Sequence, residues 1–153
     1  MQLTEHFCLT ELTSSVTGTR LGIDNTPPVW AIENLRYLAR VLETIRRHFG
    51  RPVRVSSGYR CPDLNLAVGG SPTSAHRYGL AADFRVDGVP VIEVCRWIET
   101  SLIGFDQVIY EFGESGWCHL GLCEEGALVR QESLTATKQG GNTVYKIGII
   151  SAT

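Results

Sequence analysis

The feature that most constrains the fold is the segment 29–48, where apolar side chains recur mostly at steps of three to five. Charged side chains fill the positions between them, as on the outer face of a helix that packs against a core. Pro28 stands just before this segment and Gly50 follows it, which is typical of a helix start and stop. We therefore predict a core helix here. Its expected apolar face comprises Trp30, Leu35, Leu38, Ala39, Leu42, Ile45 and Phe49.

The rest of the chain predicts shorter elements that join this helix in one α+β domain, residues 1–153, with a small antiparallel sheet packed against helices. A second amphipathic helix is expected at 90–102, with Leu102 on its apolar face, and residues 20–28 are expected to form a loop. No internal repeat or linker interrupts the chain. Strands are expected at 52–56, 80–86, 105–111, 116–122 and 143–147, and short helices at 7–12 and 63–68.

Composition and charge exclude several classes of function. The net charge is −2 and no basic run is present, so we expect no nucleic-acid partner. No apolar run approaches the length of a membrane span, so we expect no membrane insertion. Residues 1–7 lack a basic region followed by an apolar core, so no signal peptide is predicted. The five Cys residues form no Cys-x-x-Cys pair, which indicates free thiols rather than a Cys-based zinc site.

Three residues of metal-ligand type stand out. His76 and Asp83 lie seven positions apart with Gly79 between them, and His119 lies far downstream. Two His and one Asp can hold a zinc ion and leave a fourth position open for water. A His–Asp pair alone is more often structural, and His119 brings the metal interpretation level with that alternative. Bound zinc lowers the pKa of water to about 7 and polarises a carbonyl, which amide hydrolysis at neutral pH needs.

Strand alternation places a carboxylate beside this triplet. Trp117 and His119 share one face of the strand 116–122, and Glu111 lies on the preceding strand. If the two strands form a hairpin, Glu111 falls near Trp117 and diagonal to His119, within reach of a position where a general base could act. Glu114 in the tip of the hairpin is the second candidate, because a loop could swing it over the site.

Two further side chains are candidates for the substrate side. Arg60 follows a sharp turn and can hold a carboxylate through two parallel hydrogen bonds, which Lys cannot do. Ser74 lies in a loop before His76 and can donate a hydrogen bond to a substrate carbonyl. Each also has an ordinary structural role open to it, a surface salt bridge for Arg60 and a polar loop position for Ser74.

Together these residues resemble the zinc D-alanyl-D-alanine carboxypeptidase family of peptidoglycan-cleaving peptidases, whose fold is shared by the hedgehog signalling domain. The resemblance covers nearly the whole chain. The chain resembles a compact branch of this family that is met mostly in phages and prophages. The matching motifs are Ser57-Gly58-Tyr59-Arg60, Ser74-x-His76-x-x-Gly79-x-Ala81-x-Asp83 and Trp117-x-His119. Further matches are Thr10-Glu11-Leu12, Arg20-x-Gly22-Ile23-Asp24-Asn25, Leu64-Asn65-x-Ala67-Val68-Gly69-Gly70-Ser71 and Asp106-Gln107-x-Ile109-x-Glu111-Phe112.

The resemblance implies a complete set of site residues. The implied zinc ligands are His76, Asp83 and His119, and the implied substrate-facing residues are Arg60, Ser74 and Gln107. One departure concerns the general base. Many relatives carry a catalytic Glu three residues before the last His, where this chain has Gly116. We therefore expect the base to be Glu111, with Glu114 as the second choice.

The activity implied by the resemblance is zinc-dependent hydrolysis of peptidoglycan stem peptides. A D-Ala-D-Ala carboxypeptidase, an L-Ala-D-Glu endopeptidase and a cross-link endopeptidase all fit the motifs. The alternative is a non-catalytic, zinc-stabilised binding or structural module of a phage particle, which Gly116 keeps open. We expect a monomer that is encoded by a phage or prophage and made in the cytoplasm. It would act on the cell wall after release or as part of a virion.

Overall fold

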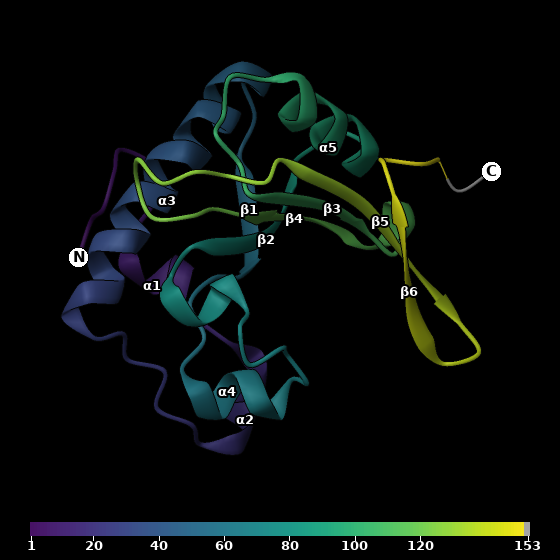
Figure 1. The fold of residues 1–153 in the computed structure, drawn as a ribbon. Helices are drawn as coiled ribbons and strands as arrows, with labels where there is room; N and C mark the ends of the chain where they lie inside the picture. Colours follow the sequence, from purple (N-terminus) through teal and green to yellow (C-terminus); the bar gives the residue numbers. More distant parts are fainter. Residues whose placement is uncertain (152–153) are drawn as a thin grey trace.

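A six-stranded sheet carries the fold, and the long helices pack against one of its faces (Figure 1). The computed structural model describes residues 1–151. The strand order is β1-β2-β4-β3-β5-β6, and every neighbouring pair is antiparallel except β3 and β5. The strands are β1 (Val53–Ser57), β2 (Ala81–Val86), β3 (Gln107–Glu111), β4 (Trp117–Gly121), β5 (Glu132–Gln139) and β6 (Asn142–Ile147). The α+β class predicted from the sequence is confirmed.

The helix α3 (Val29–Phe49) is the core helix that the apolar repeat predicts. Gly50 ends it in the left-handed conformation (φ 62°), which favours glycine. Trp30 departs from the prediction and is 52% exposed, because Ala31 takes the buried position in the first turn. The Trp30 ring lies over the surface instead, with its centroid 6.2 Å from that of Tyr78. The buried residues of α3 are Ala31, Leu35, Leu38, Ala39, Leu42 and Ile45.

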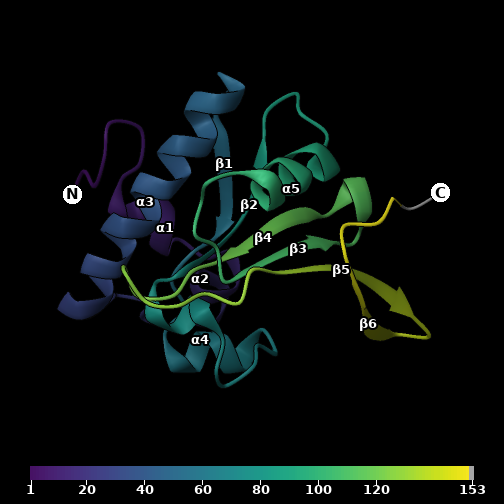
Figure 2. The same cartoon turned by 45° about the horizontal axis from the view of Figure 1, so that its top comes forward.

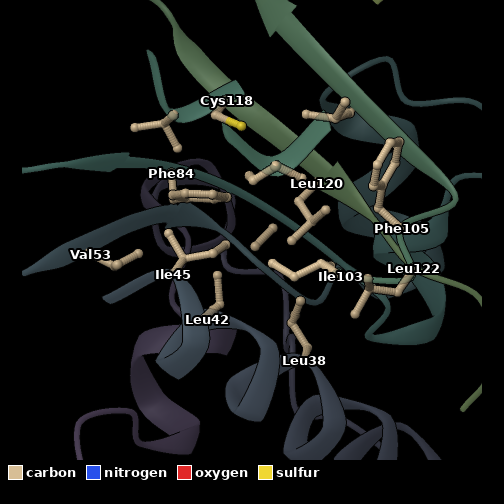
Figure 3. Close-up of a cluster of buried hydrophobic side chains, with 14 of the residues drawn as sticks. Leu38, Leu42, Ile45, Val53, Phe84, Ile103, Phe105, Cys118, Leu120 and Leu122 are labelled. Atoms are coloured by element: carbon tan, nitrogen blue, oxygen red, sulfur yellow. The ribbon is translucent and has the colours of Figure 1, made fainter. Parts of the chain in front are cut away.

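Alternation along the central strands builds the core beneath α3 and the second long helix, α5 (Val91–Thr100). Figure 3 shows Phe84, Cys118 and Leu120 from β2 and β4 gathered with Leu38, Leu42 and Ile45 of α3. Each of these side chains is fully buried. Leu102 was expected on the buried face of a helix at 90–102 but is fully exposed, because α5 ends at Thr100.

The N-terminal arm contains a helix that the sequence pattern did not predict. Residues 20–28 were expected to be loop, but α2 (Val16–Leu21) extends into them. The residues at the two ends of α2 explain why the helix forms. The Ser15 hydroxyl accepts a hydrogen bond from the Gly18 amide (3.0 Å), and Gly22 closes the helix at φ 67°. The remaining short helices are α1 (Leu9–Thr13), α4 (Pro62–Ala67), and the 3₁₀ turns η1 (Ala75–Tyr78) and η2 (Gly113–Ser115).

The C-terminal strands form a hairpin that extends the sheet beyond β3 (Figure 2). The strand β6 was expected, but β5 was not. Gly140 and Gly141 join the two strands, both at positive φ, which is the tight two-residue turn that favours glycine. The strand β4 ends beside the start of β3, so loop 122–131 delivers β5 parallel to β3 and makes the sheet mixed rather than wholly antiparallel. None of the helices formed by residues 1–151 combines the length and apolar character needed to cross a bilayer.

Candidate metal centre and substrate cleft

The candidate site lies on the sheet face opposite α3 and α5. Because side chains alternate along a strand, residues that pair across neighbouring strands share a face. Asp83 of β2 pairs with His119 of β4, and His119 pairs with Ile109 of β3. Their sequence neighbours Phe84 and Leu120 point into the helix-covered core. Two metal-ligand candidates 36 positions apart are therefore adjacent because of strand pairing.

His76 joins this pair from the turn η1, which precedes β2. Its ring Nδ1 lies 2.7 Å from the carbonyl oxygen of Gly58, so Nδ1 carries the proton and Nε2 keeps its lone pair. That nitrogen lies 3.3 Å from Oδ1 of Asp83. Gly79 ends the turn at φ 71°, and a Cβ there would lie 2.9 Å from the carbonyl oxygen of Ala31. Glycine at position 79 thus allows the close turn that brings His76 over the sheet.

The three side chains form a cluster suited to a metal ion. His119 Nδ1 lies 2.8 Å from Asp83 Oδ1, and one ligand atom from each of the three residues lies within 4.8 Å of the others. Ligands of a tetrahedral zinc ion lie about 3.3 Å apart, given bonds of about 2.0–2.1 Å. Two imidazoles and one carboxylate are an ordinary zinc donor set with one position left open. The residues present therefore fit a zinc ion.

The electrostatics of the cluster favour a neutral His76 and an ionised Asp83. Burial lowers the pKa of His76, which favours the neutral imidazole that binds metals. Burial opposes charge on Asp83 as well, but the two histidines outweigh it and lower the pKa of this carboxyl. For His119 burial acts against the proton, and the hydrogen bond to Asp83 reverses the balance and raises its pKa. Asp83 is therefore ionised and ready to serve as an anionic ligand.

The turn after β1 explains the Ser57-Gly58-Tyr59-Arg60 motif. A Cβ on Gly58 would lie 2.3 Å from the carbonyl oxygen of Leu12, so only glycine permits this contact with the N-terminal arm. The Tyr59 ring is buried in the core, and its amide donates to that Leu12 carbonyl (2.8 Å). Asn25 holds the same turn, because its side-chain amide donates to the carbonyl of Tyr59 (2.9 Å). The arm thus fixes the backbone from which Arg60 extends.

Arg60 reaches the metal centre itself. Its Nη2 lies 3.2 Å from Asp83 Oδ2, its Nε donates to the hydroxyl of Ser57 (3.0 Å), and its Nη1 lies 3.5 Å from the Asn65 side-chain oxygen. Burial lowers the pKa of Arg60, against the pull of Asp83. A guanidinium has five N–H donors, and these contacts use three of them. Arg60 therefore orients a metal-ligand candidate and still has donors for another carboxylate.

Glu111 lies where strand alternation predicts. It pairs with Trp117, and its Oε1 is 3.9 Å from Nδ1 of His119. Burial raises the pKa of Glu111 to about 7, and the negative charge of Asp83 adds to the effect. Glu111 is close enough to the metal centre to reach a group held there and is not among the three clustered ligand atoms.

The structure does not bring Glu114 to this site. Its carboxylate accepts hydrogen bonds from the Val91 amide (2.7 Å), the Ile92 amide (3.1 Å) and the hydroxyl of Tyr110. These partners lie at the first turn of α5 and on the helix-covered face of β3. Glu114 therefore stabilises the start of α5, on the face of the sheet that is remote from His119.

The hairpin backbone of this chain requires glycine at position 116, three residues before His119. A Cβ at position 116 would lie 1.7 Å from the carbonyl oxygen of Glu111. No side chain fits there unless the hairpin backbone moves. The carboxylate nearest the metal centre is instead that of Glu111, from the neighbouring strand.

All three substrate-side candidates, Arg60, Ser74 and Gln107, line the same cleft as the metal centre. The hydroxyl of Ser74 caps η1 by accepting a hydrogen bond from the His76 amide (3.3 Å), so its own proton can point elsewhere. Gln107 lies at the other end of β3 from Glu111, and its amide donates to Glu132 Oε1 (2.7 Å). Gln107 is thus held by a neighbouring strand, with one donor already occupied.

The cleft over the metal centre has a volume of about 870 Å³. One wall comes from α2 and the loop 68–75, and the other from the β5–β6 hairpin. A smaller hollow of about 400 Å³ between α1 and α2 contains none of the candidate residues. The hairpin wall contributes Lys138, Thr143 and Tyr145, none of which was predicted as a site residue. The Gly140-Gly141 pair after a Ser- and Thr-rich alternating segment was the available signal for this hairpin.

A mixed sheet with a buried His–Asp–His cluster and an adjacent carboxylate is the arrangement expected of a zinc-dependent hydrolase. The sequence matches the family model described as Peptidase M15 over residues 5–120. The chain therefore belongs to the Peptidase M15 family, whose members are zinc-dependent peptidases. No curated protein matched the sequence. The match contains all three ligand candidates and ends before the β5–β6 hairpin.

Proposed function

We propose that this protein is a zinc-dependent hydrolase of peptidoglycan stem peptides. The observation that carries the proposal is the position of the Glu111 carboxylate, 3.9 Å from His119 and open to a cleft that also contains Arg60. A ligand triplet, a base and a carboxylate-binding cation are the three parts that cleavage near a peptide carboxylate requires. The stem peptide as substrate rests on the resemblance of the motifs.

Each residue has a defined task in this mechanism. His76, Asp83 and His119 would hold zinc, which when bound lowers the pKa of water to about 7 and polarises the scissile carbonyl. Glu111 would take the proton of the attacking water and return it to the leaving amine nitrogen. The free N–H groups of Arg60 would bind a substrate carboxylate, while its Nη2 keeps Asp83 oriented.

The test uses purified sacculi incubated with zinc-loaded protein, followed by mass spectrometry of the muropeptides. New amines and a defined mass loss are the expected result, and the masses identify the bond that is cut. His76→Ala should abolish both zinc binding and cleavage. Full cleavage by that variant with stoichiometric zinc retained would refute the assignment of the metal centre.

The same experiment tests the second candidate, a zinc-stabilised binding or structural module. Zinc at full occupancy with no cleavage of any sacculus preparation would favour that module. The absence of a Glu at position 116 favours the non-catalytic module, whereas the 3.9 Å separation between Glu111 and His119 favours a hydrolase. A role in phage lysis or in a virion is proposed from sequence likeness alone, and so is a monomeric state.

A further inference from the structure

The β5–β6 hairpin presents one of its two faces to the cleft. Glu111 of β3 pairs with Ala136 of β5, and Ala136 pairs with Tyr145 of β6. These three residues therefore share the face of the sheet that carries the metal centre. Lys138 lies two positions after Ala136 on β5, so its side chain emerges on that same face.

Lys138 is held in place without a carboxylate partner. Its ammonium donates to the hydroxyl of Thr143 (2.9 Å) and lies 5.2 Å from the centre of the Phe112 ring. Arg60 and Arg130, which also line the cleft, each contact an Asp carboxylate. Within residues 1–151, no carboxylate oxygen lies within 4.0 Å of the Lys138 nitrogen. The hairpin wall thus carries a positive charge that this part of the chain does not neutralise.

The location of this charge relates it to the reaction. Across the sheet, Arg60 lies beside β1 and β2, Glu111 lies on β3, and Lys138 lies on β5. Neighbouring strands are about 4.8 Å apart, so a peptide bound across the strands would pass from Arg60 over the metal centre to Lys138 within a few residues. The exposed ring of Tyr145, which is 56% accessible, lies on the same wall.

We propose that the cleft-facing side of the β5–β6 hairpin is a subsite for an acidic group of the substrate, with Lys138 as its anchor. This inference rests on the proposed function for the identity of the substrate. The group bound would be an internal carboxylate of the stem peptide, on the other side of the scissile bond from the carboxylate held by Arg60. A Lys ammonium suits it because a flexible point charge accepts a carboxylate in several orientations.

The chain offers a closely matched control. Lys138 and Lys146 are its only two lysines, and both lie exposed on this hairpin. Lys146 of β6 pairs with Thr135 of β5, so it lies on the face turned away from Glu111 and the cleft. Lys138→Gln and Lys146→Gln therefore remove the same charge from the same element, one on each face.

The experiment measures binding by zinc-loaded Glu111→Gln protein, in which the peptide should remain intact. Two synthetic stem peptides are compared, one with free internal carboxylates and one with those groups amidated, both with a free C-terminal carboxylate. Adding Lys138→Gln should weaken binding of the free peptide roughly tenfold, the scale of a charge-assisted hydrogen bond. Binding of the amidated peptide should stay within about twofold, and Lys146→Gln should change neither affinity by more than that.

Equal effects of the two lysine variants, or equal losses for the two peptides, would overturn the subsite. Failure of the proposed function has a different signature, because wild-type protein would then release no fragment from either peptide or from sacculi. The affinity comparison still decides the subsite in that case, since it needs no turnover. If neither peptide binds the zinc-loaded parent protein detectably at millimolar concentration, the subsite for stem-peptide carboxylates is refuted.

Discussion

Glu111 and Glu114 are the same residue type, three positions apart, and they end on opposite faces of the sheet. Glu111 is the last residue of β3 and lies beside His119, where burial raises its pKa to about 7. Glu114 lies in the turn η2, and its carboxylate accepts amide hydrogen bonds at the start of α5. For Glu114 burial also opposes the charge, but the hydrogen bonds from Tyr110, Ile92 and Val91 prevail and lower its pKa.

The difference shows how backbone geometry assigns roles to identical side chains. Phe112, directly between β3 and η2, has φ 64°, a left-handed conformation that is uncommon for an aromatic residue. This turn carries the chain from the cleft face to the helix face within three residues. We therefore expect substitutions on the cleft face to lower catalysis and substitutions on the helix face to lower stability.

The largest difference between the effect on catalysis and the effect on stability should come from Glu111→Gln. Loss of the base should lower kcat/KM by about 10²–10⁴-fold, the usual contribution of a positioned general base. Zinc content should remain at one ion per chain, and the thermal midpoint should not fall, because a buried carboxyl is replaced by its neutral isostere. Steady-state cleavage of a stem peptide measures kcat/KM, metal analysis measures the zinc content, and thermal unfolding measures the midpoint. Unchanged turnover in this variant would remove Glu111 from the mechanism.

Leu120→Ala, one residue from the ligand candidate His119, should show the opposite pattern, a loss of stability with zinc binding retained. Leu120 is fully buried under the helices, so the truncation should lower the free energy of unfolding by about 2–5 kcal/mol. At a temperature where the variant is folded, zinc stoichiometry should be retained because His119 faces the other way. Urea unfolding and metal analysis test this. A stable variant that loses zinc would show that the two faces of β4 are not independent.

A smaller effect on the helix face is expected from Glu114→Gln. The variant keeps an acceptor oxygen but loses the negative charge at the start of α5, so the free energy of unfolding should fall by about 0.5–1 kcal/mol. Peptide cleavage should stay within about twofold of wild type. Chemical denaturation and the same cleavage assay provide the comparison with Glu111→Gln. A loss of turnover like that of Glu111→Gln would contradict the separation of the two carboxylates.

The smallest predicted effect is the pH dependence of the difference in unfolding free energy between wild type and Glu114→Gln. Since folding lowers the pKa of Glu114 below its ordinary value of 4.5, its stabilisation is fully present above pH 4.5. It is lost as the pH falls through the folded-state pKa. The stability gap between wild type and Glu114→Gln should therefore be constant from pH 7 to about 5.5 and shrink at lower pH. Denaturation curves across this range measure the gap, and a gap that widens on acidification would contradict this account.

The sequence was informative where function depends on local repetition or alternation. The apolar repeat of α3 predicted the helix, and alternation on β3 and β4 predicted that Glu111 would lie beside His119, as it does. The strand β5 was missed because its alternation combines Leu134 and Ala136 with small polar residues, which resembles a loop. The parallel pairing of β5 depends on where β4 ends, which no local pattern records.

The sequence by itself determined the candidate ligand set, the core helix and the faces of β3 and β4, because these follow from residue chemistry and from the periods of helices and strands. Only the tertiary structure decided which of two glutamates reaches the metal centre, that Arg60 contacts Asp83, and that Lys138 faces the cleft. Those outcomes depend on the left-handed turn at Phe112 and on the order of strands in the sheet. Such contacts join residues far apart in the chain, and their free energy is set by the assembled fold.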